Sequence, residues 1–145
     1  MHLRLMHWLV LAVCFALSNS AHAARLEITT TADTTDASEC SIRNAMKAIN
    51  TQQEEGACEA GNGNDRVMLQ PGATYTLTQG QLNIGGGQDL EGKDVKPQVR
   101  FLVDDEADGE GNVILERDAN SPAFRVFSVH PVSELILVST TVRNG

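Results

Sequence analysis

The sequence predicts a mainly β protein that carries one short helix near the start of its mature chain. From Gly61 onward, short apolar segments alternate with Gly, Asn, Asp or Pro, a pattern typical of strands separated by turns. Only residues 41–50 carry apolar side chains at helical spacing. Aromatic residues make up 4% of the chain, which limits the core that it can bury. We therefore expect one small domain and no helical bundle.

Residues 1–23 have the order of a secretory signal peptide. A short basic region with Arg4 precedes the apolar run 8–17, and Ala21-His22-Ala23 supplies an A-x-A cleavage pattern. The apolar run is about half the ~20 residues that cross a bilayer. The sequence thus predicts an exported protein (secreted, periplasmic or at the cell surface) whose mature chain starts at Ala24 and has no transmembrane segment.

A lipoprotein signal ending at Cys14 is the alternative. Val13 fits poorly before the acylated cysteine, where a small residue is usual, and cleavage there would leave apolar residues 15–17 on the mature chain. The A-x-A site is the better interpretation.

The chain is acidic. Its formal net charge is −8, and loss of Arg4 with the signal peptide removes one positive charge and leaves −9. This balance argues against nucleic acid or anionic membranes as partners. Cations or neutral glycans fit it better.

The mature chain opens with a brief strand and a helix. Leu26 and Ile28 alternate with polar residues, and a polar loop follows over residues 30–38. Apolar residues then fall at helical spacing, with Ser41 as the N-cap and Asn50 as the end of the helix.

Two cysteines, Cys40 and Cys58, remain after signal cleavage, and an even number in an exported chain favours a disulfide. The helix is about 15 Å long, and residues 51–57 can extend about 23 Å. The chain can therefore return to bring the two cysteines together. A disulfide that closes a loop of this size stabilises a fold by about 3 kcal/mol.

The pattern of the remaining chain predicts short strands. They are expected at residues 67–69, 74–78, 82–84, 99–103, 113–116, 124–129, 135–138 and 141–143. No repeat period is visible by eye, and residues 88–98 and 104–112 look like loop insertions. Composition alone leaves sandwich, barrel and solenoid open.

Several motifs narrow this choice. Thr29-Thr30-Thr31-Ala32-Asp33, Cys40-Ser41-Ile42-Arg43-Asn44-Ala45 and Pro71-Gly72-Ala73-Thr74-Tyr75-Thr76-Leu77 stand in the order found in the bacterial CSLREA domain. The chain resembles that family over residues 28–84. The resemblance implies an N-terminal cap (residues 24–66) on a right-handed parallel β-helix of the pectin-lyase-like shape (residues 67–145). It places such proteins outside the cell or on its surface and implies no reaction.

The motif departs from the family at Ile42, where Leu is usual, and at Asn44, where Glu is usual. The family's Ser and Glu form a capping box, and Asn is too short to complete one. We therefore expect a weaker helix start, with the disulfide compensating. At the other end the chain stops at a turn without a cap. We expect a truncated β-helix of two to three coils.

Candidate chemistry is sparse. Asp104, Glu106 and Asp108 match the first positions of a calcium loop, but Leu115 stands where that loop needs a bidentate Glu. A solvated acidic loop is the preferred interpretation, with Ca²⁺ as a weak candidate. Gly85-Gly86-Gly87 reads as a flexible turn, and His130 as structural or solvated.

Polysaccharide lyases of this fold use clustered aspartates and a basic residue. None of the candidate bases lies in a lyase motif: Arg100, Arg117, Arg125 and Arg143. We expect no catalytic residues. The leading hypothesis is a non-catalytic exported β-helix module, adhesin-like or glycan-contacting. The alternative is the N-terminal piece of a polysaccharide lyase or hydrolase.

Overall fold

The computed structural model describes residues 23–103 and 111–145, and these form a mainly β fold with one helix. The elements in chain order are β1 (Arg25–Glu27), α2 (Ile42–Thr51), β2 (Asn64–Leu69), β3 (Thr74–Leu77), β4 (Leu82–Ile84), β5 (Gln98–Val103), β6 (Val113–Arg117), β7 (Phe127–Val129), β8 (Glu134–Leu137) and β9 (Thr140–Arg143). The predicted fold class is confirmed at this level.

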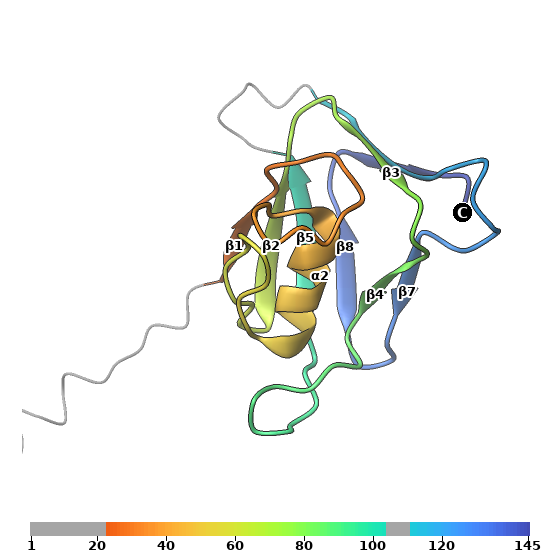
Figure 1. Ribbon diagram of the computed structural model, residues 1–145. Helices are drawn as coiled ribbons and strands as arrows, with labels where there is room; N and C mark the ends of the chain where they lie inside the picture. The colour runs from red at the N-terminus through yellow and green to blue at the C-terminus, as the bar shows by residue number, and fades with distance from the viewer. Residues whose placement is uncertain (1–22, 104–110) are drawn as a thin grey trace, which may run out of the picture.

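The strands form three parallel sheets, in the orders β1-β2-β5-β8, β3-β6-β9 and β4-β7. From β2 onward the chain visits the three sheets in turn, returns to the first sheet at β5, and does so again at β8. Figure 1 shows β1, β2, β5 and β8 side by side, with β4 and β7 forming a separate wall. Each parallel neighbour is reached through a long crossover, as parallel pairing requires.

The spacing between stacked strands is uneven. Arg66 pairs with Arg100 in the first sheet, whereas Thr74 pairs with Ile114 in the second, which is a longer step along the chain. Ile114 in turn pairs with Thr141, and this step is the shortest of the three. Crossovers of such different lengths explain why no repeat period is visible in the sequence.

Inward side chains stack from strand to strand and form one core. Leu26, Val67 and Phe101 lie in register on β1, β2 and β5 and are at most 1% exposed. Phe101 also meets Phe127 edge to face, with ring centroids 5.6 Å apart. Burying each such side chain contributes about 1.5–3 kcal/mol.

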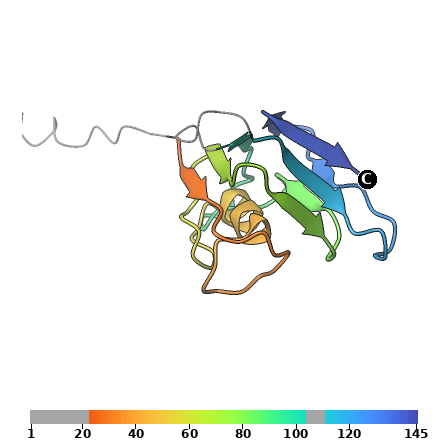
Figure 2. The ribbon, with the colours of Figure 1, turned by 90° about the horizontal axis from the view of Figure 1, so that it is seen from above.

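Helix α2 closes one end of this core. The Ser41 hydroxyl accepts the Asn44 N–H at 3.1 Å and so caps the helix. The helix ends at Thr51, one residue beyond the expected Asn50, where Gln52 takes a left-handed conformation. It packs against β4. Figure 2 shows α2 at the end where β1 lies, with β3, β6 and β9 stacked away from it.

The glycine turn after β4 is packed, not merely flexible. A Cβ at Gly87 would lie 2.1 Å from the backbone oxygen of Asn50. Gly85 and Gly86 both have positive φ, which glycine adopts without strain. The turn therefore runs directly against the C-terminal end of α2.

Candidate functional site

The predicted disulfide is present. Cys40 and Cys58 are bonded with their Cα atoms 4.6 Å apart, and both are buried. Beside the bridge, the Ala57 N–H donates to the Glu39 carbonyl at 3.2 Å. The bridge thus ties the residue before the helix N-cap to the segment that returns from the helix.

Asn44 takes a different role from the Glu that the capping motif prefers. Its side chain is buried and its amide nitrogen donates to the carbonyls of Asp36 and Glu39, at 2.8 and 2.9 Å. The hydroxyl of Ser41 also donates to the Thr34 carbonyl. Instead of completing a capping box, Asn44 fastens the 34–39 loop to the first turn of α2, so the substitution brings a contact of its own.

A second fastening point is Asp33. Its carboxylate forms an ion pair with Arg43, and only 3% of its side chain is exposed. The same carboxylate accepts the backbone N–H groups of Thr78, at 2.6 Å, and Gln79, at 2.8 Å. Arg43 also donates to the Gly80 carbonyl at 2.6 Å. Asp33 therefore joins the loop before the helix, the helix itself and the turn that leads into β4.

These contacts shift the pKa of Asp33. Partial burial alone would raise the pKa, but the bond from Arg43 and the N–H groups of Thr78 and Gln79 outweigh it. The pKa of Asp33 consequently lies below its ordinary value, and the carboxylate is charged at neutral pH.

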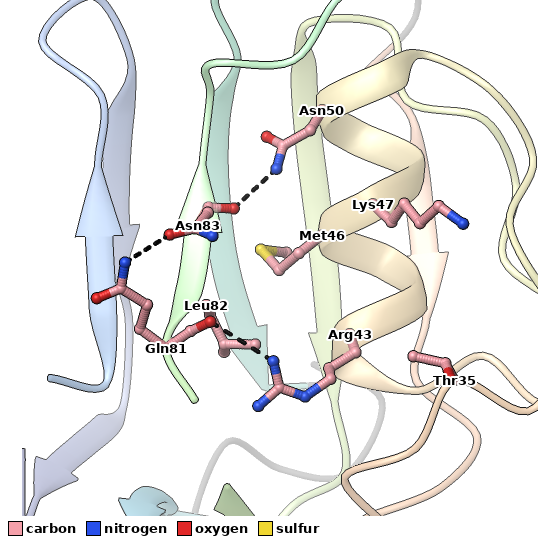
Figure 3. Close-up of a pocket in the computed structure, with 8 residues that line it drawn as sticks. All are labelled: Thr35, Arg43, Met46, Lys47, Asn50, Gln81, Leu82 and Asn83. Carbon is pink, nitrogen blue, oxygen red and sulfur yellow. Dashed lines mark hydrogen bonds between the residues drawn. The ribbon is translucent and has the colours of Figure 1, made fainter. Parts of the chain in front are cut away.

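A shallow groove of about 250 Å³ lies between α2 and β4. Figure 3 shows its lining residues. They come from the loop before the helix, from α2, and from β4 with the residue before it: Thr35, Arg43, Met46, Lys47, Asn50, Gln81, Leu82 and Asn83.

Most polar groups in the groove are already engaged. The Asn50 amide donates to the Asn83 carbonyl at 2.8 Å and accepts the Gly85 N–H at 2.7 Å. The Gln81 side chain donates to that of Asn83 at 2.9 Å, and Lys47 pairs with Glu55. The groove is thus a polar seam that holds α2 against β4. Figure 3 shows the bonds that cross from Asn50 and Arg43.

Asp65 is a buried carboxyl at the start of β2. It is fully buried, and one oxygen accepts the Asn62 N–H at 2.8 Å while the other has no partner among the described residues. Burial raises the pKa of Asp65, although the N–H groups of Asn62 and Gly63 offset part of this effect. Its bonds shape the turn that leads into β2, a structural role.

Among the described residues, the candidate arginines and His130 do not form one site. Asp104, Glu106 and Asp108 lie outside the described residues. Arg117 donates to the carbonyls of Asp118, Ser121 and Asn144, and Arg143 pairs with Glu116 at 2.6 Å. The remaining candidates are exposed: Arg100, Arg125 and His130. Among the described residues, no cluster of three or more His, Cys, Asp or Glu side chains could hold a metal ion.

Neither the Asp33 cluster, which consists of Asp33, Arg43 and the turn over residues 78–80, nor the polar seam between α2 and β4 was predicted from the sequence. Both Asp33 and Arg43 stand in the motifs quoted above, but their separation along the chain carries no signal of contact. Both side chains also bond to the turn before β4, which lies much further along the chain. No local pattern could have revealed these contacts.

No protein-family model, curated protein or solved structure matches the chain. Within the part of the chain that the structure describes, no helix is long and apolar enough to cross a membrane. The disulfide and this finding are compatible with an exported protein.

Proposed function

We propose that the chain is a non-catalytic, exported module with the architecture of a capped right-handed parallel β-helix, and that it contacts glycans at a cell surface or in secreted form. The observation that carries the proposal is the combination of stacked parallel sheets with a disulfide-fastened helix at one end. The motif resemblance to the CSLREA domain points the same way.

The cap solves a physical problem of stacked sheets. The first coil of a solenoid has no preceding coil, so its core side chains and strand edges need a cover. Ile42, Ala45 and Ile49 of α2 are at most 1% exposed and join the core there. The disulfide, the Asp33 cluster and the Asn50 seam hold this cover in place, which suits a module exposed to an extracellular environment.

Asp33 and Asp65, two carboxyls whose pKa is shifted in the folded state, have structural partners. Asp33 is held by Arg43 and two backbone N–H groups, and Asp65 by the turn before β2. A catalytic acid or base needs instead to face the reacting group. This assignment supports a binding module over the lyase or hydrolase alternative.

Export is tested by expressing the full chain in a Gram-negative host and sequencing the amino terminus of the exported protein. We expect the mature chain to start at Ala24 and to contain no free thiol. A terminus at an acylated Cys14, an intact Met1 or reduced cysteines would contradict the proposal.

The non-catalytic role is tested with the exported protein on pectate, with millimolar Ca²⁺ and then with chelator. We expect no release of unsaturated uronate in either condition. Calcium-dependent release that is lost in Asp104→Ala, Glu106→Ala and Asp108→Ala would support the enzyme alternative instead.

A further inference from the structure

Three arginines stand in one row across the first sheet. Arg25 of β1 pairs with Arg66 of β2, and Arg66 pairs with Arg100 of β5. All three side chains are exposed. Their neighbours Leu26 and Val67 point into the core, so the arginines project from the opposite, outer face, because successive side chains of a strand alternate between faces. We call this row the arginine row.

Two arginines of the row, Arg66 and Arg100, lack the carboxylate partner that several other basic residues of the molecule have. Arg43 and Arg143 have carboxylate partners, and so does Lys47. Arg25 pairs with Glu27 of its own strand. No ion pair or hydrogen bond involves the side chain of Arg66 or Arg100 within the described residues.

Such a row is unfavourable for folding alone. Neighbouring parallel strands lie about 4.8 Å apart, and like charges directly opposite one another on adjacent strands are destabilising. Glu27 and Glu134 project from the same face, but neither lies in the row. Along the strand direction, the register position of Glu27 is two residues after the row and that of Glu134 is two residues before it. The row itself contains no acidic residue. In a chain of net charge −8, the exposed guanidinium groups of Arg66 and Arg100 are available to bind an external anion.

The geometry restricts the anion. Guanidinium groups bind carboxylates through paired, planar hydrogen bonds, and the three arginines of the row stand at paired positions of neighbouring strands, along a line that crosses the sheet. A thin linear polymer with a carboxylate at regular intervals can follow this line. A membrane surface or a nucleic acid duplex is broad and would also meet the acidic remainder of the molecule, which repels it.

We infer that Arg25, Arg66 and Arg100 form a binding surface for a linear, carboxylate-bearing polysaccharide. The inference names the class of glycan for the proposed function and rests on that function for the choice of a saccharide. It revises the expectation, drawn from net charge alone, that neutral glycans are the better partners.

The test measures binding of the exported protein to polygalacturonate at low and physiological salt. The same polymer with its carboxyls methyl-esterified is the neutral probe, and duplex DNA is the second polyanion. The variants are Arg66→Gln, Arg100→Gln and the two combined. Arg125→Gln is the matched control, because Arg125 is also an exposed arginine without a partner among the described residues but lies outside the row.

We expect each row variant to weaken polygalacturonate binding about tenfold and the double variant to abolish it, while Arg125→Gln has no effect. The melting temperatures of the row variants should be unchanged or higher, because like-charge repulsion is relieved. Binding that is unaffected in the double variant, or equally tight binding of the esterified polymer or of DNA, would overturn the inference and leave the wider proposal standing. If the protein binds neither polygalacturonate nor the esterified polymer, the glycan-contacting function is overturned as well.

Discussion

At the scale of single residues, Asp33 holds three segments together through one carboxylate. We predict that Asp33→Asn destabilises the protein at pH 7 by about 3 kcal/mol, the usual cost of leaving one partner of a buried ion pair alone. The pKa of Asp33 is lowered in the folded state. Its contribution is therefore complete above the unfolded value of about 3.9 and is lost as the pH falls through the lower folded pKa.

Urea unfolding of wild type and Asp33→Asn, from neutral pH down to a pH below the folded pKa, measures this contribution. The two stabilities should converge at the acid end of the range. Asp118→Asn is the control, because Asp118 is a half-buried aspartate whose carboxylate bonds stay within its own turn. A constant difference between wild type and Asp33→Asn at every pH would show that the charge of Asp33 is irrelevant.

Asp65 should respond in the opposite direction. Its folded pKa is raised by burial, so the folded state binds more protons between the unfolded and folded pKa values, and stability falls as the pH rises through that interval. We predict that Asp65→Asn is more stable than wild type at pH 7 by about 1 kcal/mol, because a partly unsatisfied buried charge is removed. The gain should vanish as the pH falls below the unfolded value of about 3.9.

The same unfolding series checks this prediction. Asp65→Ala separates charge from hydrogen bonding, because it also removes the acceptor for the Asn62 N–H, and it should be less stable than Asp65→Asn at every pH. Equal stability of wild type and Asp65→Asn at pH 7 would argue that the folded carboxyl carries no cost.

At the scale of elements, the disulfide closes a sequence separation of 18 residues around α2. We predict that the double Cys40→Ser, Cys58→Ser variant loses about 3 kcal/mol of stability, since the unfolded chain is no longer constrained. Its melting temperature should fall by more than about 10 °C. Reductant should produce the same loss in the wild type and none in the variant, and a wild type insensitive to reductant would contradict this role of the bridge.

The contact between α2 and the glycine turn gives a second test at this scale. A side chain at Gly87 would meet the backbone of Asn50, whereas one at Gly92 would meet nothing within 4 Å. We predict that Gly87→Ala costs clearly more stability than Gly92→Ala, which should cost only about 1 kcal/mol for its positive φ. Thermal unfolding decides, and equal losses would show that the turn can move away from the helix.

Most elements could be predicted from local patterns, because their side chains alternate or recur regularly. The helix and the strand over residues 82–84 are recovered almost to the residue, and the disulfide follows from the cysteine count. The packed glycine turn could not be predicted. Its need for Gly87 comes from the carbonyl of Asn50, a residue far away in the chain, and the glycines alone indicate only a turn.

At the scale of the whole molecule, the arrangement of the strands escapes local patterns altogether. The partners in the arginine row, Arg25, Arg66 and Arg100, are far apart along the chain and come from three different strands. Each arginine by itself is an ordinary exposed residue of a strand. Only the register of the parallel sheet, which long and unequal crossovers set, makes them neighbours. The acidic composition of the whole chain favoured cations or neutral glycans as partners, because a net charge contains no information on where the basic residues gather.

The two sides of the stack are unequal, which leads to a prediction for the isolated chain in solution. Helix α2 covers one side, whereas β7, β8 and β9 are the outermost strands on the other. Val129 of β7 is 43% exposed and Val142 of β9 is 41% exposed. Exposed strand edges with apolar side chains favour association with other chains. We therefore expect the isolated chain to self-associate as its concentration rises.

Light scattering across a concentration series, coupled to size-exclusion chromatography, measures this association. Val129→Lys and Val142→Lys should reduce it with little change in melting temperature, because natural sheets use charges at such edges to prevent pairing. Leu90→Lys is the matched control, since Leu90 is 83% exposed but lies in the loop between β4 and β5. If Leu90→Lys reduces association as much as the edge variants, general surface hydrophobicity drives it. If only the edge variants do, contact between chains occurs through the uncovered strands.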